Sequence, residues 1–192
     1  MPALISGKET AVHKRNLQKS TLERNGIVDN RPKVALVMGS KSDLASLRGF
    51  FDILKEFDLP YTARVLSAHR TPAAAADFAQ NADIEGIEVI CAAAGKAAHL
   101  AGAMAAHSVL PIIGIPVKSS TLDGLDALLS TVQMPAGMPV ATVAIDGAAN
   151  AALLAVQILS IKYPELKEKL KSYRKSMIEK VLEADKALQE EI

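Results

Sequence analysis

Short apolar runs alternate with segments of helical periodicity over most of this chain. The predicted strands span residues 34–38, 61–66, 87–92, 111–115 and 140–145. The predicted helices span residues 44–57, 72–81, 97–107, 124–131 and 150–160. Strands that read as continuous apolar runs are buried on both faces, as in parallel sheets covered by helices. The pattern therefore predicts an α/β fold with a central parallel sheet between two helical layers.

The same pattern divides the chain into three parts. Residues 1–32 are polar, follow no consistent period and hold more basic than acidic side chains, so we expect an N-terminal extension or leader without chemistry. Residues 33–160 form the expected α/β domain, a three-layer sandwich with flavodoxin-like or Rossmann-like strand order. Residues 161–192 are strongly charged, and an apolar stripe from Leu166 to Leu188 predicts an amphipathic helix, packed on the domain or on a neighbouring subunit.

Composition limits the classes of function. With 192 residues, 49% of them hydrophobic, and a net charge of +1, the chain predicts one globular domain without the positive field that attracts nucleic acid or anionic membranes. No apolar run reaches the length of a membrane span, and the first residues lack the layout of a secretory signal. Cys91, the one cysteine, lies in an apolar run, so we expect a buried, inert thiol and a reducing, cytoplasmic setting.

Four unusual loops follow the first four predicted strands, at residues 39–43, 67–72, 93–99 and 117–122. In a right-handed parallel α/β sheet the carboxyl ends of the strands share one edge, and ligands bind there where the strand order reverses. We therefore expect the four loops to converge on one crevice. Because the chain is nearly neutral, any anion site in this crevice must be local.

The first loop, Gly39-Ser40-Lys41-Ser42-Asp43, offers backbone N–H groups to an anion and the Asp43 carboxylate to ribose hydroxyls. Helix capping by Ser42 or Asp43 would explain the same residues. The loop matches neither GxGxxG nor GxxxxGK[ST], and residues 7–10 lack the upstream glycine and strand of a nucleoside-triphosphate site. We therefore expect no ATP site.

The second loop places His69 beside Arg70, within Ser67-Ala68-His69-Arg70-Thr71-Pro72. Histidine gains and loses a proton near neutral pH, and arginine directs two N–H donors onto phosphate oxygens. Thr71 and Pro72 start the next helix and fix the backbone behind the pair. A histidine beside an arginine can also be a chance surface feature, but the place of this pair at the predicted crevice favours a site.

The third loop, residues 93–100, holds mostly small side chains, which let the backbone approach a flat ligand closely. Tight packing of the following helix would require the same small residues. Lys96 and His99 are candidate substrate contacts in this loop, whereas His107, later in the helix, is interpreted as a packing or surface residue.

Two uncharged segments indicate contacts between subunits. Residues 133–139 combine methionine and proline without any charge, which is typical of a contact surface, here beside the pocket. Residues 148–152 open a helix that is too apolar to face solvent on either side, and a homo-oligomer would bury it.

Four ordered motifs together resemble the bacterial PurE family: Gly39-Ser40-Lys41-Ser42-Asp43, Ser67-Ala68-His69-Arg70-Thr71-Pro72, Ala97-Ala98-His99-Leu100 and Gln133-Met134-Pro135. The resemblance covers about residues 33–160. It implies an isomerase of purine (IMP) biosynthesis that moves the N5-carboxylate of N5-carboxyaminoimidazole ribonucleotide to C4, which gives 4-carboxyaminoimidazole ribonucleotide. It also implies no ATP, metal, biotin or other cofactor, and a compact homo-octamer with sites near subunit junctions.

The resemblance also implies a role for each candidate residue. His69 would be the general acid and base. Three residues would hold the ribose phosphate portion: Ser40, Asp43 and Arg70. The imidazole and carboxylate end would be lined by Ser67, Gly95, Lys96 and His99. The third loop departs from the family pattern Gly-Gly-Ala-Ala-His-Leu-Pro-Gly, because Lys96 and Ala101 stand at its second glycine and its proline.

Two alternatives differ from this mutase in their chemistry. The related aminoimidazole ribonucleotide carboxylases add free CO2 to the ring, and their histidine loop resembles Ser-Ala-His-Lys and their third loop Gly-Arg-Ser-Asn. Arg70-Thr71-Pro72 and Ala97-Ala98-His99 favour the mutase over this type. A nucleotide-binding module with the same fold and no turnover would bind the ribonucleotide without using His69.

Overall fold

The computed structural model describes residues 32–120 and 122–192. Apart from Pro32, the extension predicted over residues 1–32 lies outside the described residues. Five parallel strands form one sheet in the order β2-β1-β3-β4-β5. The strands are β1 (Lys33–Met38), β2 (Tyr61–Val65), β3 (Ile87–Gly95), β4 (Ile112–Val117) and β5 (Ala141–Thr142). This is the flavodoxin-like order, and it confirms the predicted fold class.

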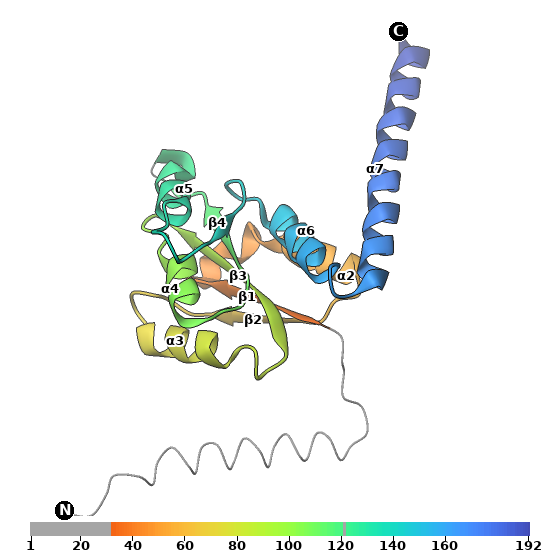
Figure 1. Cartoon of the computed structure of the whole chain (residues 1–192). Coiled ribbons are helices and arrows are strands. Elements are labelled where there is room, and N and C mark those ends of the chain that lie inside the picture. The colour runs from red at the N-terminus through yellow and green to blue at the C-terminus, as the bar shows by residue number, and fades with distance from the viewer. Residues whose placement is uncertain (1–31, 121) are drawn as a thin grey trace, which may run out of the picture. The chain divides into compact units, whose positions relative to one another are not determined.

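Helices cover both faces of the sheet (Figure 1). They are α2 (Arg48–Glu56), α3 (Pro72–Asn81), α4 (Leu100–His107), α5 (Leu125–Val132), α6 (Ala148–Leu159) and α7 (Pro164–Glu191), with short 3-10 turns η1 (Lys41–Ala45) and η2 (Leu122–Gly124). On one face, Leu36 of β1 shares a buried cluster with Phe50 of α2 and with side chains of α6. On the other face, Val37 packs with Phe78 of α3 and Met104 of α4. The arrangement is the expected three-layer sandwich.

The third strand is longer than predicted. It runs to Gly95 instead of ending at residue 92, because the strands on both sides continue beside it. Ala93 is in register with Met38 of β1, and Gly95 with Val117 of β4. The loop predicted over 93–99 therefore shrinks to residues 96–99. Cys91 in the same strand is fully buried, and burial raises the pKa of its thiol, as an inert cysteine requires.

The fifth strand and the first helix are shorter than predicted. Strand β5 holds only two of the residues 140–145, because the chain then leaves the ladder and bonds to β4 only at separate points. The helix predicted over 44–57 divides into η1 and α2. Its first residues make hydrogen bonds between residues three apart, such as Ser46 N–H to Asp43 O at 3.1 Å, which form a 3-10 turn. The α-helix therefore begins only at Arg48.

Helix α6 buries several of its alanines within its own chain. Ala151, Ala152 and Ala155 are fully buried in the cluster that also contains residues of α2, β1 and β3. The small side chains let α6 lie close to its neighbours in this layer. Burial of these alanines therefore does not require a second subunit, and the homo-oligomer stays a prediction.

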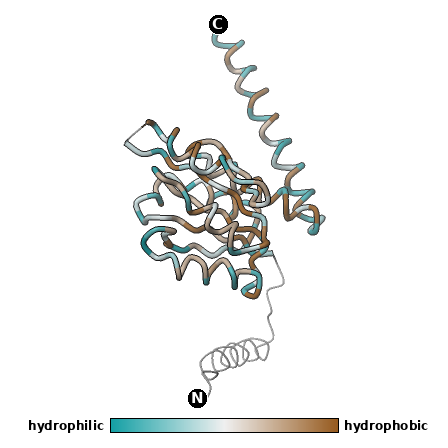
Figure 2. The backbone as a smooth tube through the Cα atoms, turned by 60° about the vertical axis from the view of Figure 1, so that its left-hand side comes forward, coloured by the Kyte–Doolittle hydropathy of each residue, from teal (hydrophilic) through white to brown (hydrophobic). Residues whose placement is uncertain are grey.

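Helix α7 is the predicted C-terminal helix, and only its first turns pack on the domain. Leu166 is buried, and Leu170 and Tyr173 pack against the same cluster as α6. From Met177 onward every side chain is exposed. Figure 2 shows hydrophobic and hydrophilic residues alternating along this part of the helix. None of the helices in the described part of the chain is long and apolar enough to span a membrane.

Replacing Gly114 by alanine is expected to destabilise the protein by about 2 kcal/mol. A Cβ at this position in β4 would overlap Cγ2 of Thr131 and lie 3.0 Å from Cγ1 of Val140. Thr131 is poorly able to turn away, because it is 2% exposed and its Oγ1 donates to Ala127 O at 2.7 Å. Chemical unfolding measures the loss. Gly39→Ala is the control, because its Cβ would meet no atom closer than 3.9 Å. Equal stability of the two variants would contradict the prediction.

Candidate active site

The predicted site residues lie in the wall of one cavity at the carboxyl ends of β1 to β4. The cavity has a volume of about 740 Å³. All eight residues line it: Ser40, Asp43, Ser67, His69, Arg70, Gly95, Lys96 and His99. The strand order reverses between β1 and β3, so the loops that follow these two strands diverge and open a crevice. The structure therefore brings the predicted residues together, whereas their roles stay predictions.

The loop after β1 is held by a short chain of side-chain hydrogen bonds. Ser40 caps η1, and its Oγ accepts from the Ser42 N–H at 3.3 Å and lies 2.7 Å from Ser42 Oγ. Ser42 Oγ donates to Asp43 Oδ1 at 3.3 Å. The cap is thus Ser40, and neither Ser42 nor Asp43 serves as one. Among the described residues Asp43 Oδ2 has no partner, so it can accept from a ligand hydroxyl.

Arg70 is held on one edge by hydrogen bonds and exposed on the other. Its Nη2 donates to Gly39 O at 2.7 Å, which joins the loops after β2 and β1. Its backbone N–H and its Nε donate to Ser67 Oγ at 3.1 and 3.5 Å. Thr71 completes the turn, because its Oγ1 accepts from the Ser67 N–H at 2.9 Å. The remaining guanidinium N–H groups can bind an anion in the cavity.

His69 and His99 meet in the wall of the cavity. Nε2 of His69 lies 2.9 Å from Nδ1 of His99, with the rings nearly perpendicular at 81° and their centroids 5.1 Å apart. One nitrogen donates and the other accepts, so the bond is compatible with a positive charge on only one of the two rings. When His69 is charged, its Nε2 donates to His99 and its Nδ1–H remains available to a ligand. The pair can therefore deliver a proton and recover it.

The end of β3 brings backbone close to the cavity. A Cβ on Gly95 would lie 3.1 Å from the carbonyl oxygen of Val117, so only glycine fits without displacing β4. Lys96 follows with φ of 56°, in the left-handed region that residues with a Cβ rarely adopt. His99 then precedes the first residue of α4. The close packing at Gly95 thus fixes where the residues up to His99 enter the cavity wall.

Four further polar residues in this wall were not predicted as site residues: Ser42, Ser46, Lys118 and Ser119. Lys118 and Ser119 directly follow β4, so their position at the carboxyl end of a strand is a signal that could have identified them. Ser46 carries no such signal. It reaches the wall because η1 inserts a turn before α2, which the helical period of the sequence does not reveal.

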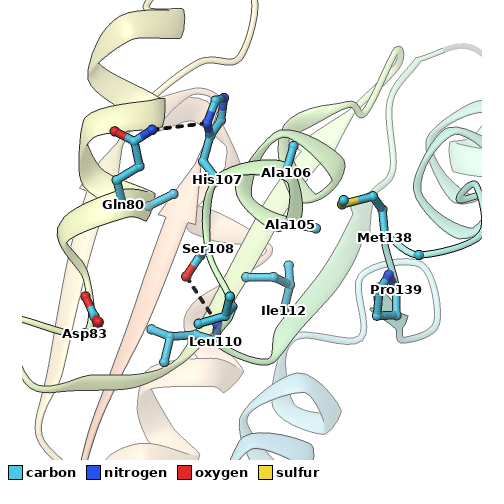
Figure 3. A pocket seen from close by; sticks show the side chains of 13 residues that line it. Gln80, Asp83, Ala105, Ala106, His107, Ser108, Leu110, Ile112, Met138 and Pro139 are labelled. Atoms are coloured by element: carbon cyan, nitrogen blue, oxygen red, sulfur yellow. Dashed lines mark hydrogen bonds between the residues drawn. The ribbon is translucent and has the colours of Figure 1, made fainter.

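A second cavity, of about 600 Å³, contains none of the eight predicted residues (Figure 3). It is lined by residues of α3 and α4 and by the segment that precedes β5. His107 lies there, at the end of α4, with Nδ1 3.5 Å from Nε2 of Gln80. His107 is exposed, which agrees with its interpretation as a surface residue.

Comparison with known proteins supports the resemblance drawn from the motifs. A family model described as AIR carboxylase matches residues 33–180. N5-carboxyaminoimidazole ribonucleotide mutase of Pyrococcus horikoshii is 58% identical over 160 residues, which are 83% of this chain and 90% of that protein. The protein of the same name from Thermotoga maritima is 52% identical over 83% of this chain and 93% of its own length. The crystal structure of Treponema denticola PurE has a TM-score of 0.74 and 31% identity, and covers 82% of this chain and 99% of that chain. The chain therefore belongs to the AIR carboxylase (PurE) family.

Proposed function

We propose that this chain is an isomerase that converts N5-carboxyaminoimidazole ribonucleotide to 4-carboxyaminoimidazole ribonucleotide in purine biosynthesis. The observation that carries the proposal is the bonded pair of His69 and His99 in one cavity with Arg70. A substrate with a phosphate and an exchangeable proton needs a cation and a proton carrier in the same cavity. The relatives named N5-carboxyaminoimidazole ribonucleotide mutase, which are 50–58% identical over most of this chain, support the same reaction.

The proposed mechanism uses one proton, which His69 gives and takes back. In the first half, charged His69 donates its proton to N5 of the carbamate, the N–CO2 bond breaks, and CO2 and the amine are released. In the second half, C4 of the electron-rich ring attacks CO2, and neutral His69 removes the proton from C4. The carboxyl group has then moved from nitrogen to carbon, and His69 has returned to its first form. The scheme draws on no cofactor.

The other predicted residues bind the substrate in this proposal. The Arg70 guanidinium holds the phosphate, and the Asp43 carboxylate accepts from ribose hydroxyls, with Ser40 beside it. The imidazole and carboxylate end lies against Ser67, Gly95, Lys96 and His99. Several small residues line the same cavity, namely Ala68, Ala94 and Ala97. A cavity wall of small side chains favours the second half of the reaction, because the backbone can enclose the ring closely and the released CO2 must stay beside it.

We further propose a cytoplasmic homo-octamer in which residues 33–160 form the catalytic domain, and the helix in 161–192 packs on the domain by its first turns and on a neighbouring subunit by its exposed part. Apolar side chains stay exposed on two helices: Leu125, Leu129 and Val132 of α5, and Val181, Leu182 and Leu188 of α7. Association would remove these surfaces from water. The uncharged segment 133–139 directly follows α5 and extends its surface. Light scattering of the purified chain measures the number of copies.

Two candidate substrates distinguish the proposed reaction from its alternatives. Purified protein receives either N5-carboxyaminoimidazole ribonucleotide without bicarbonate or aminoimidazole ribonucleotide with bicarbonate, and the absorbance of the carboxylated product is followed. We expect rapid conversion in the first mixture and much slower conversion in the second. Turnover only with bicarbonate would identify a carboxylase that uses free CO2. Binding of both compounds without turnover would identify a non-catalytic nucleotide-binding module.

A further inference from the structure

Two lysines stand next to each other on neighbouring strands at the cavity. Gly95, the last residue of β3, is in register with Val117, the last residue of β4. Lys96 and Lys118 are the next residues of the two strands, and both line the cavity. Neighbouring strands lie about 4.8 Å apart, so the two backbones leave the sheet close together. The wall at this end of the cavity therefore holds two positive charges.

Neither lysine has a strong counter-ion. Within the described part of the chain, Lys96 makes no hydrogen bond or ion pair, and it is exposed. Nζ of Lys118 pairs with Asp123 at 3.0 Å, but the two side chains are 57% and 85% exposed. An ion pair so exposed contributes little stability, because water screens both charges. A bound anion can therefore replace Asp123 at Lys118 and pair with Lys96 at the same time.

Unfavourable backbone conformations occur in the same two loops. Lys96 has φ of 56°, and Asp123 has φ of 51°. Asp123 lies in a turn of three left-handed residues, between Leu122 with φ of 53° and Gly124 with φ of 92°. Left-handed backbone costs free energy for any residue with a Cβ, and such conformations gather at ligand sites. Lys96 and Asp123, the counter-ion of Lys118, thus both have backbone conformations that are locally unfavourable.

The position of the lysines separates them from Arg70. The Arg70 guanidinium lies at the end of β1, where its Nη2 donates to Gly39 O, and Lys118 follows β4. Only β3 lies between β1 and β4, so the two positions are about 10 Å apart at the usual strand spacing. The pair of His69 and His99 joins the loops after β2 and β3, between these two positive regions. A ribonucleotide with its phosphate on Arg70 and its imidazole at the histidines would therefore extend its carboxylate toward the lysines.

We propose that Lys96 and Lys118 form a subsite for the carboxylate of the substrate. In the free protein Asp123 pairs with Lys118, and the substrate carboxylate replaces it on binding. The inference rests on the proposed function and deepens it. The two ammonium groups hold the carboxyl group beside the ring in substrate and product alike. They therefore act on affinity for carboxylated ribonucleotides and on KM, rather than on the proton transfer itself.

The test compares two ligands by calorimetric titration of the full-length chain: 4-carboxy-5-aminoimidazole ribonucleotide, and 5-aminoimidazole ribonucleotide, which lacks the carboxylate. Lys96→Gly and Lys118→Met should each raise the Kd of the carboxylated compound about tenfold, and that of the other compound less than twofold. Lys96→Arg should keep most of the affinity. Because glycine adopts positive φ freely, Lys96→Gly should not lower Tm, so a loss of affinity is not a loss of fold.

Asp123→Asn is expected to increase affinity for the carboxylated compound, whereas the lysine variants lower it. It removes the counter-ion of Lys118, so the Kd of the carboxylated compound should fall two- to threefold. Lys55→Met is the matched control, because it removes the same charge from an exposed position outside the cavity wall. Equal losses for both ligands, or no loss for either, would overturn the subsite. If the wild type binds the carboxylated compound but does not convert N5-carboxyaminoimidazole ribonucleotide, the proposed function fails, and the comparison still decides the subsite.

Discussion

Replacing His69 by asparagine is expected to lower kcat for N5-carboxyaminoimidazole ribonucleotide by a factor of about 10³ and to change substrate affinity less than threefold. Asparagine is polar and of similar size, so it can still form a hydrogen bond near His99. It cannot gain or lose a proton near neutral pH, so both halves of the proposed reaction lose their proton carrier. Affinity survives because other groups, Arg70 above all, hold the substrate. Steady-state kinetics gives kcat, and calorimetry of the carboxylated product gives affinity.

The control for this variant is His107→Asn. His107 is exposed and lies at the second cavity, so its replacement should leave kcat unchanged (Figure 3). Near-normal turnover of His69→Asn would show that another group moves the proton. His99 would then be the nearest candidate, because its ring nitrogen lies 2.9 Å from His69. A loss of affinity as large as the loss of kcat would instead assign His69 to binding.

The sheet was predictable from the sequence where both of its faces are covered. Residues 34–38 are all buried, so the run is apolar at every position and is recognised as a central strand. The edge of the sheet gave a misleading signal. Residues 140–145 are largely apolar, and Val140 and Val143 are partly buried against the two core clusters, but only Ala141 and Thr142 join the ladder. In the centre of a sheet, apolar residues are both buried and paired with neighbouring strands, whereas at the edge an apolar run can extend beyond the residues that pair.

The site was predictable as a set of loops, and its internal contacts were not. Ser67 to Arg70 could be placed because they follow a strand at the shared edge of the sheet. The bond between His69 and His99 depends on how two loops thirty residues apart approach each other, which no local pattern records. The same holds for Lys96 and Lys118, whose proximity comes from the register of β3 and β4. Sequence patterns thus identified the loops that carry the site residues, whereas the contacts between these loops could be found only in the three-dimensional structure.

Replacing Arg70 by alanine is expected to raise the Kd of 4-carboxy-5-aminoimidazole ribonucleotide about 100-fold, which corresponds to about 2.7 kcal/mol, with a much smaller effect on kcat. The guanidinium is already held by Gly39 O and Ser67 Oγ, so little side-chain entropy opposes its bond to a phosphate. The variant also removes the bond from Nη2 to Gly39 O, which joins two loops of the site.

Two further variants separate phosphate binding from support of the loops by Arg70. Arg70→Lys keeps the charge but cannot direct two N–H donors onto one anion, so it should recover only part of the affinity. Arg48→Ala removes an arginine outside the cavity wall and should leave the Kd unchanged. Aminoimidazole ribonucleotide, which shares the phosphate but has no carboxylate, should lose affinity for Arg70→Ala by the same factor. If instead neither ligand loses affinity, the phosphate does not lie on Arg70, and Lys96 and Lys118 are the other lysine or arginine side chains of this cavity wall that could hold it.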